Sequence, residues 1–350
     1  MLNVAVIGAG IGAQHVEAYA ALPHLFNVLR VVDIKLTLAS TLAQTVGATP
    51  SQNIDDALQD PDIDVIDICL PPNLHVEYAL KSLAHGKHVV CEKPIATSLK
   101  DANILVFAMQ KSGKKLYPVF QYRWGPPLQQ LEALIFGGWT GKPQIAALET
   151  HWARGAEYYD IPWRGTWAGE QGGAVLCHAI HSHDLLCHFF GPVRSLSACV
   201  ATRANPIETE DCAAISFEMT CGALATSNIT LGAAHNETRL KFVFEHLTVT
   251  SGTAPYAPGS EKWTFETRDP AKQPEVNAFL NELGFEHIGF TGFFTEVAQD
   301  LLQQNSAAVT MQEGIASIEL VTAIYHAART GARVSLPISS DHPLYEGWTP

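Results

Sequence analysis

A glycine-rich turn directly after the first apolar segment constrains the fold of this chain more than any other feature. Residues 8–13 read Gly-Ala-Gly-Ile-Gly-Ala and follow Leu2–Ile7, an apolar run typical of a buried parallel strand. The G-x-G-x-x-[G/A] pattern turns a strand into a helix whose free N–H groups attract a pyrophosphate. We expect Gly8 to permit the turn, Gly10 to admit the pyrophosphate, and Ala13 to keep the helix close to the strand.

The end of the second strand-like segment supplies an acid. Asp33 lies twenty positions after Ala13, where a carboxylate can accept hydrogen bonds from the ribose hydroxyls of a dinucleotide. The same carboxylate would repel a 2′-phosphate, so the sequence favours NAD over NADP, although Arg30 and Lys35 lie close by. Strand, glycines, helix, strand and acid in this order predict a dinucleotide site, with Ile11 also in contact with the cofactor.

Short apolar runs alternate with helical patterns over the first 120 residues. This alternation predicts a doubly wound parallel sheet flanked by helices, and we assign residues 1–122 to an NAD-binding Rossmann domain. Ser98 and Asp101 have the spacing of a helix N-terminal cap. The expected strands are Leu2–Ile7, Leu29–Val32, Val65–Leu70, His88–Cys91 and Leu116–Phe120, and the expected helices are Gln14–Leu22, Leu36–Val46, Leu74–His85 and Lys100–Gln110.

After Gly125-Pro126-Pro127 the pattern changes to that of antiparallel strands. We assign residues 123–350 to a substrate-binding and oligomerisation α/β domain with a large, open, mostly antiparallel sheet. Cys221-Gly222 lies where a hairpin turn is expected, and Thr310 and Glu313 have capping-box spacing. The expected strands, read as a meander, are Ile145–Trp152, Ser195–Thr202, Ala213–Thr220, Leu224–Leu231, Lys241–Glu245 and Lys262–Thr267, followed by helices Ile288–Gln304 and Met311–Thr330.

Composition disfavours several kinds of partner. The chain has 22 basic and 35 acidic residues, a formal net charge of −13, and nucleic-acid binding needs a basic face. No apolar run reaches the ~18 residues of a membrane span, and the N-terminus does not read as a secretory leader. Seven cysteines without a CxxC pair are typical of reduced thiols, so we expect a cytoplasmic protein. Charged residues make up only 16%, which indicates that some surface is buried between subunits. Since the expected C-terminal sheet has one face free to pair, we expect a homo-oligomer through that sheet.

Two further segments are expected at the carboxyl edge of the parallel sheet. The first, residues 69–75, begins at the end of the fourth strand and is expected to contact the cofactor, or Asn73 in it caps the next helix. The second, Glu92-Lys93-Pro94, ends the fifth strand. Its lysine is either a surface residue at the start of a loop or an acid/base group beside the nicotinamide, which exchanges a proton with a substrate hydroxyl. The cofactor contacts expected from the first segment are Leu70, Pro71, Asn73 and His75.

These motifs together resemble the Gfo/Idh/MocA oxidoreductase family, which includes glucose–fructose oxidoreductase and inositol dehydrogenases. The likeness continues through Gln121-Tyr122-Arg123, Trp163–Trp167 and Ile180–Asp184 and covers nearly the whole chain. It implies reversible hydride transfer between NAD and a sugar or cyclitol carbon, with Lys93 as the catalytic lysine and His181 as the active-site histidine. The remaining expected cofactor contacts are Glu92, Lys93, Gln121, Trp163 and Arg164.

The segment Gly172–Phe190 carries a polar stripe. His178, His181, Asp184 and His188 recur at spacings of three and four, which places them on one face of a helix. Such a face binds substrate, with Asp184 orienting the His181 ring, or it is exposed, or it holds hydrogen-bonded core histidines. We expect no metal, because a lysine can manage the proton in hydride transfer. Many relatives carry an acid or amide four residues before the histidine, where this chain has Cys177.

An aromatic-rich segment precedes this stripe. Tyr158-Tyr159 and Trp163–Trp167 combine rings that stack on sugar C–H surfaces with a guanidinium that binds hydroxyls or a carboxylate. Alternatively, the loop packs over the cofactor for structural reasons. The expected substrate contacts are Lys93, Arg123, Tyr158, Arg164, His178 and His181.

These features predict an NAD-dependent dehydrogenase that acts on a secondary hydroxyl of a sugar, sugar derivative or cyclitol. We expect Lys93 and His181 to converge on one nicotinamide ring as acid and base. There are two alternatives. Tightly bound NAD could support redox-neutral epimerisation or elimination, or the chain could be a non-catalytic NAD-dependent sensor.

Overall fold

The computed structural model describes residues 1–285 and 287–350 and divides into two compact units. Unit 1 comprises Met1–Phe120 and Phe290–Ile318, and unit 2 comprises Gln121–Gly289 and Glu319–Pro350. The expected boundary at residue 122 assigns everything after it to the second domain. The structure instead packs residues 290–318 with the N-terminal segment, so the chain passes between the units more than once.

A six-stranded parallel sheet forms the centre of unit 1 and confirms the predicted Rossmann fold. Its strands are β1 (Leu2–Ile7), β2 (Phe26–Val32), β3 (Thr49–Ser51), β4 (Val65–Ile68), β5 (His88–Cys91) and β6 (Leu116–Pro118). They lie in the order β3-β2-β1-β4-β5-β6, and all neighbours are parallel. The chain therefore changes direction across the sheet between β1 and β4, and doubly wound sheets bind ligands at the carboxyl ends of such a strand pair.

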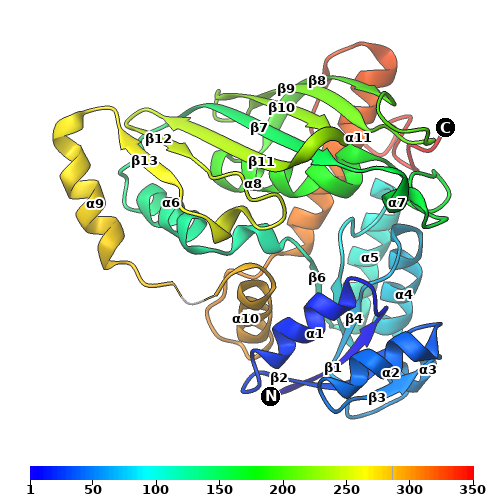
Figure 1. Ribbon diagram of the computed structural model, residues 1–350. Helices are drawn as coiled ribbons and strands as arrows, with labels where there is room; N and C mark the ends of the chain where they lie inside the picture. Colours follow the sequence, from blue (N-terminus) through cyan, green and yellow to red (C-terminus); the bar gives the residue numbers. More distant parts are fainter. Residues whose placement is uncertain (286) are drawn as a thin grey trace. The chain divides into compact units, whose positions relative to one another are not determined.

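Helices flank this sheet (Figure 1), and their ends follow the local capping chemistry. Ser98 Oγ accepts the Asp101 N–H at 3.0 Å, and Glu313 accepts the Thr310 N–H at 2.7 Å, so both predicted caps are confirmed. The helices of unit 1 are α1 (Gly12–Ala20), α2 (Leu36–Gln44), α3 (Asp55–Leu58), α4 (Pro72–Ala84), α5 (Leu99–Ser112), α10 (Gly289–Leu301) and the first part of α11 (Met311–Thr330).

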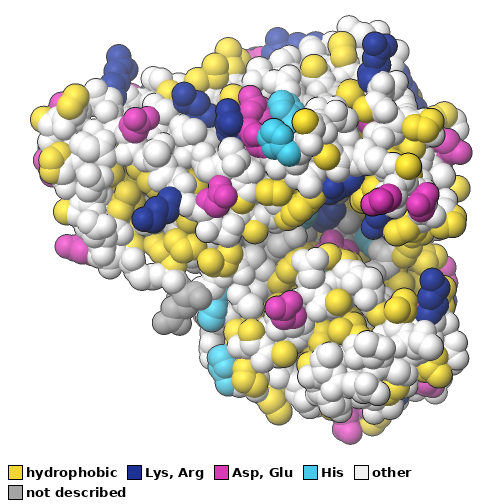
Figure 2. Space-filling model, viewed as in Figure 1, with side chains coloured by type: hydrophobic (Ala, Val, Ile, Leu, Met, Phe, Trp, Pro, Cys, Tyr) yellow, Lys and Arg dark blue, Asp and Glu magenta, His cyan; other side chains and the backbone are white. Residues whose placement is uncertain are grey.

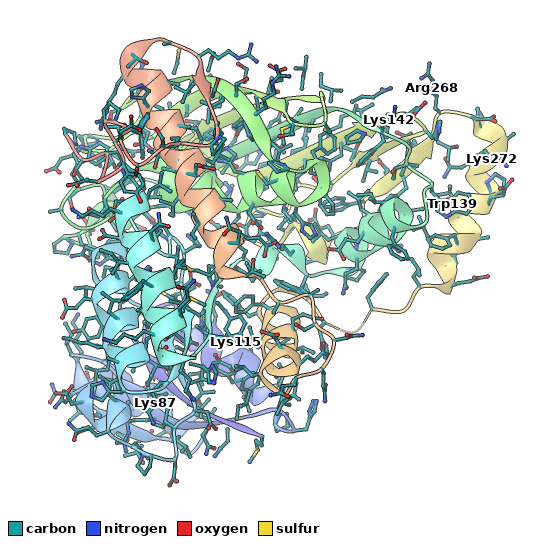
Figure 3. All side chains as sticks on the ribbon, turned by 180° about the vertical axis from the view of Figure 1, so that it is seen from behind. Lys87, Lys115, Trp139, Lys142, Arg268 and Lys272 are labelled. Atoms are coloured by element: carbon teal, nitrogen blue, oxygen red, sulfur yellow. The ribbon has the colours of Figure 1, made fainter. Side chains whose placement is uncertain are left out.

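Helix α10 joins unit 1 through contacts that are distant in sequence. The Phe294 ring stacks on Tyr19, with 4.0 Å between the ring centroids. Asp300 accepts a hydrogen bond from the Tyr117 hydroxyl at 2.7 Å. It also forms an ion pair at 2.9 Å with Lys115, which Figure 3 labels. Hydrophobic periodicity predicts that this helix exists, but these contacts decide which unit it belongs to.

Unit 2 contains an eight-stranded, mostly antiparallel sheet, as predicted. Its strands are β7 (Pro143–Ala153), β8 (Val193–Ala201), β9 (Cys212–Met219), β10 (Leu224–Thr230), β11 (Gly232–Phe244), β12 (Leu247–Thr250), β13 (Thr264–Thr267) and β14 (Val334–Ser335). Their order is β13-β12-β11-β7-β10-β9-β8-β14. Because β7 pairs in parallel with β10, the sheet is not the simple meander that we expected from the sequence. Gly222 has φ +90° in the turn between β9 and β10, where the hairpin was predicted.

Helices cover one face of this sheet. Figure 1 shows α8 and α6 along one side of the sheet. Buried and exposed residues alternate along β9 and β10, as expected for strands with one covered face. The opposite face includes the exposed side chains of Ile145 and Leu224. Pairing with another subunit through this face stays a prediction. The helices of unit 2 are α6 (Pro126–Phe136), α7 (Ala156–Tyr159), α8 (Ile180–Phe190), α9 (Gln273–Glu282) and the remainder of α11.

The surface matches the acidic composition. Figure 2 shows basic and acidic side chains dispersed over the visible face, without a continuous basic area. All seven cysteines lie in the described part of the chain, and no disulfide joins them there. None of the described helices is both long and apolar enough to cross a membrane.

Candidate active site

The glycine turn in unit 1 contains two glycines that the protein itself requires. Gly8 has φ +103°, and a Cβ added to it would lie 2.4 Å from the Cys69 carbonyl oxygen. A Cβ on Gly12 would lie 2.9 Å from Val6 Cγ1. Gly12 therefore keeps the helix close to the strand. The prediction that Ala13 does so is wrong, because Ala13 is exposed.

Gly10 differs from these two glycines. A Cβ added to it would meet no protein atom within 4 Å, and its φ is not positive. The fold alone gives no reason for glycine at this position. A ligand that approaches the backbone closely at the start of α1 would require glycine here, because a side chain would block it. The pyrophosphate of a dinucleotide is such a ligand.

Asp33 is held beside this turn. Its carboxylate accepts the Ala9 N–H at 2.9 Å and the Lys35 N–H at 2.8 Å, which fixes both oxygens at the end of β2. Arg30 forms an ion pair with Asp60 at 3.1 Å, so of the two nearby cations only Lys35 lacks a carboxylate partner among the described residues. The neighbouring Ile34 side chain is 84% exposed. This exposed apolar residue lies next to the acid predicted to bind the ribose, and the sequence analysis missed it.

The turn after β4 is tied to the segment that follows Lys93. His75 is 1% exposed, and its ring nitrogens lie 2.7 Å from the carbonyl oxygens of Leu70 and Pro94. Burial lowers the pKa of His75, while the two carbonyls act in the opposite direction. The His75 ring thus holds the turn after β4 against the segment that follows Lys93. We had expected this side chain to contact the cofactor directly. Pro71 precedes the first turn of α4, so Asn73 is not its cap, and Asn73 is exposed.

A buried charge network lies beneath Lys93. The His15 ring contacts Asp67 at 2.8 Å and Glu92 at 3.1 Å, and Glu92 Oε2 accepts the Lys93 N–H at 3.1 Å. Burial alone would lower the pKa of His15, but the charge of Asp67 raises it well above its usual value. Burial alone would raise the pKa of Glu92, but the hydrogen bond and charge of His15 lower it. His15 is therefore an imidazolium between two carboxylates. It holds Glu92, which in turn fixes the backbone of Lys93.

The sequence analysis missed His15 and Asp67. Asp67 could have been found, because it is a fully buried acid inside the apolar strand β4. The side chains of His15, Asp67 and Cys69 also have the composition of a metal site. However, the 2.8 Å between His15 Nδ1 and Asp67 Oδ2 is a hydrogen-bond length, shorter than the roughly 3.3 Å between two nitrogen or oxygen ligands on a tetrahedral zinc ion.

In unit 2, a buried carboxylate anchors the segment that carries the predicted histidines. Glu210 accepts the N–H groups of Gly173 and Val175 at 3.1 and 3.0 Å and the Tyr325 hydroxyl at 2.9 Å. A Cβ on Gly173 would lie 1.9 Å from the Glu210 carbonyl oxygen, so only glycine fits there. Burial raises the pKa of Glu210 to about 7, although these hydrogen bonds act against the rise.

A π-helical turn, Val175–Ala179, precedes α8 and changes the predicted stripe. His181 stacks on the Tyr122 ring at 4.2 Å, and His178 Nε2 lies 3.3 Å from the Tyr158 hydroxyl. Asp184 forms a two-pronged ion pair with Arg123 at 2.6 and 2.8 Å. Asp184 therefore does not orient His181, as we had expected. Arg123 is 6% exposed and bound to Asp184, so a structural role fits it better than the predicted substrate contact.

The aromatic-rich segment of unit 2 surrounds two guanidinium groups. Arg164 Cζ lies 4.0 Å and Arg154 Cζ 4.8 Å from the centroid of the Tyr158 ring. Arg154 also contacts the rings of Trp152 and Tyr256 at 5.0 and 5.5 Å. Sequence reasoning predicted Tyr158 and Arg164. It missed Arg154, Trp152 and Tyr256, and Tyr256 follows its hydrogen-bond partner Arg154 by 102 residues.

The remaining predicted contacts lie at the start of unit 2 and in the same loop. The side-chain oxygen of Gln121 is buried and has no hydrogen-bond donor among the described residues, which leaves it able to bind a ligand. Trp163 is half-buried and lies 5.4 Å from Arg164 Cζ. A separate hollow of about 690 Å³ in unit 2 is lined by Trp139, Arg268 and Lys272, among others (Figure 3). None of the predicted site residues lines it, and Lys272 forms an ion pair with Glu275 there at 2.9 Å.

Two family models match the chain. Residues 2–120 match "Oxidoreductase family, NAD-binding Rossmann fold", and residues 128–250 match "GFO/IDH/MocA C-terminal domain". The chain belongs to the Gfo/Idh/MocA family. The two models confirm the resemblance inferred from the sequence and the predicted NAD-binding Rossmann domain.

Solved structures resemble this Gfo/Idh/MocA protein over nearly its whole length. The WlbA dehydrogenase from Bordetella pertussis, in complex with NADH and UDP-GlcNAcA, is 29% identical, with a TM-score of 0.84 over 97% of this chain and 99% of that chain. The enzyme from Chromobacterium violaceum, with the same two ligands, is 30% identical, with a TM-score of 0.85 over 97% and 96%. Levoglucosan dehydrogenase with NADH and levoglucosan is 21% identical, with a TM-score of 0.81 over 96% and 100%, and shows the shared fold only.

Curated relatives match over shorter stretches. D-glucoside 3-dehydrogenase from Escherichia coli is 30% identical over 56% of this chain and 57% of that protein. The oxidoreductase YrbE from Bacillus subtilis is 29% identical over 63% and 64%. This Gfo/Idh/MocA protein thus spans less than two thirds of the length of these relatives.

Proposed function

We propose that this protein is an NAD-dependent dehydrogenase that oxidises a secondary hydroxyl of a sugar, sugar derivative or cyclitol, or reduces the corresponding ketone. One observation carries the proposal. Lys93 follows β5 at the carboxyl edge of the NAD-binding sheet, and its backbone is bonded to Glu92, which is itself fixed by His15. A lysine side chain held at this edge suits proton exchange during hydride transfer, because the amine accepts the hydroxyl proton in oxidation and the ammonium returns it in reduction.

Each residue has a definite task in this reaction. Bound NAD supplies the hydride acceptor. In the oxidative direction Lys93 takes the hydroxyl proton, since an alkoxide is too basic to form alone, and a positioned acid/base group contributes about 10²–10⁴-fold. His181, stacked on Tyr122 at 4.2 Å, is the second group that handles the proton. Asp33 and Gly10 bind the ribose and the pyrophosphate.

The relatives support the sugar or cyclitol as substrate class. They include the E. coli D-glucoside 3-dehydrogenase and an inositol 2-dehydrogenase from Saccharopolyspora erythraea, which is 31% identical over 41% of this chain. We assign cofactor binding to residues 1–122 and substrate binding and oligomerisation to residues 123–350.

Lys93→Ala tests the proposal. We expect the variant to lose turnover, because the proton has no acceptor, and to bind NADH with nearly unchanged affinity. Formation of NADH is measured by absorbance with a panel of sugars, sugar acids and inositols, each with NAD and with NADP. Lys111→Ala, at an exposed position on α5, is the matched control.

Three other outcomes would contradict the proposal. Loss of NADH binding together with turnover would make Lys93 a structural residue. Conversion of a sugar without accumulation of NADH would indicate epimerisation or elimination with retained cofactor. Binding of NAD with no redox reaction across the whole panel would indicate a sensor.

A further inference from the structure

Two positive charges share one aromatic ring in unit 2. The guanidinium carbons of Arg154 and Arg164 lie 4.8 and 4.0 Å from the centroid of Tyr158. Attraction to the ring stabilises each cation, but two cations that contact the same ring also repel one another. The arrangement therefore favours a negative charge close to both.

Among the described residues no carboxylate forms an ion pair with either guanidinium group, although the charge of Glu170 acts on the Tyr158 hydroxyl. Four arginines are not classed as exposed, and two of them, Arg30 and Arg123, form ion pairs with Asp60 and Asp184. The other two, Arg154 and Arg164, have no carboxylate partner within ion-pair distance in residues 1–285 and 287–350. This is notable in a protein with 35 acidic and 22 basic residues.

Donor groups on both arginines are also left without acceptors. Arg154 Nη1 donates to Ala153 O, Asn236 Oδ1 and Tyr256 Oη at 3.1, 3.2 and 3.0 Å, and Arg164 Nη1 donates to Tyr158 O at 3.3 Å. The Nε atom of each arginine is buried and has no acceptor among the described residues. A buried unpaired donor is costly, and carboxylate or phosphate oxygens are the acceptors that guanidinium groups fit best.

The pair lies beside the helix with the predicted active-site histidines. The Tyr158 hydroxyl is 3.3 Å from His178 Nε2, and the Trp152 ring is 5.2 Å from the His178 ring. His178 lies in the π turn that leads directly into α8, which carries His181. A ligand group bound at the arginines would thus belong to a molecule that reaches the catalytic helix.

We propose that the substrate is an anionic sugar, and that Arg154 and Arg164 bind its carboxylate or phosphate while Tyr158 and Trp152 face its carbon skeleton. The inference rests on the proposed function, which names only a sugar or cyclitol. A uronic acid and a sugar phosphate share the required chemistry, and the experiment separates them.

Binding to the NADH-loaded protein tests the charge. Calorimetry compares D-glucuronate, D-glucose 6-phosphate and UDP-glucuronate with neutral D-glucose. We expect one anion to bind at least about 10-fold more tightly than glucose, and Arg154→Gln or Arg164→Gln to weaken that anion about 10- to 100-fold and glucose far less. Arg164→Lys should recover part of the affinity, since it keeps the charge. Arg239→Gln, at an exposed arginine paired with Glu237, is the control.

Two results would overturn the inference. One is that glucose binds as tightly as every anion, and the other is that the arginine variants weaken glucose and anion binding equally. If a variant does not fold, salt dependence of the wild type decides, because added NaCl should weaken anion binding and leave glucose unaffected. Anion binding without oxidation of any substrate would contradict the proposed dehydrogenase and leave this inference intact. Oxidation of neutral sugars alone would contradict this inference and leave the proposed dehydrogenase intact.

Discussion

At the scale of single residues, His15 has the most consequential contacts. It is buried between Asp67 and Glu92, at 2.8 and 3.1 Å, and it lies 4.5 Å from the Phe290 ring. Removing one member of a buried ion network leaves the others uncompensated. Because Glu92 also bonds to the Lys93 backbone, the effect should reach Lys93, the proposed acid/base group.

We expect His15→Ala to lower the free energy of unfolding by about 3–5 kcal/mol, measured by urea denaturation. The raised pKa of His15 also sets the pH dependence: its stabilisation is complete below the usual value of 6.5 and is lost as the pH rises through the higher folded-state pKa. The wild type should therefore lose stability on the alkaline side more steeply than His15→Ala. An effect no larger than that of His85→Ala, at an exposed position, would refute the network.

At the scale of elements, Glu210 determines where the segment before α8 begins, since it accepts the Gly173 and Val175 N–H groups. Its folded-state pKa of about 7 lies above the usual 4.5, so the folded protein binds this proton more tightly than the unfolded chain. The free energy of unfolding should fall as the pH rises from 4.5 to 7. Glu210→Gln should flatten that part of the curve of Tm against pH. Glu266→Gln, at an exposed site, is the control. If the curve of Tm against pH for Glu210→Gln ran parallel to the curves of the wild type and of this control, Glu210 would not titrate in this pH range.

The elements also show which features sequence reasoning can reach. Caps such as Ser98 and Thr310 depend on residues three positions apart, and they were predicted correctly. The parallel pairing of β7 with β10 and the packing of α10 on Tyr19 depend on residues far apart in the chain, and they were not predicted. Lys93, His181 and the glycine turn stand in recognisable motifs, but the sequence assigned to Ala13 the packing role of Gly12.

The site shows the same division. Arg154 acts through Asn236 and Tyr256, which come from distant parts of the chain, so no local pattern identifies it. Asp67 stands out locally as an acid in an apolar strand, but its partner His15 does not. The π turn before α8 adds a further difficulty, because spacings of three and four no longer place residues on one face. Sequence reasoning therefore identifies the motif residues of the family more readily than the buried residues that position them.

At the scale of the whole molecule, the uncovered sheet face leads to a prediction about assembly. Ile145 and Leu224 are 48% and 55% exposed and stand side by side in the β7–β10 register. We expect analytical ultracentrifugation to give the mass of at least two copies, and Ile145→Glu with Leu224→Glu to shift the protein toward the monomer by placing charges on the apolar contact. Ile104→Glu, exposed on α5 of unit 1, is the control. A monomeric wild type would contradict pairing through this sheet.

The return of residues 290–318 to unit 1 limits how the protein can be dissected. A fragment that stops at residue 120 would keep every strand of the Rossmann sheet but lose Phe294, which packs on Tyr19 and Phe26, and Asp300, which pairs with Lys115. Such a truncation would present an aromatic surface to water and invite aggregation. An isolated cofactor-binding module would have to be built by grafting residues 290–318 onto the first 120 through a short linker.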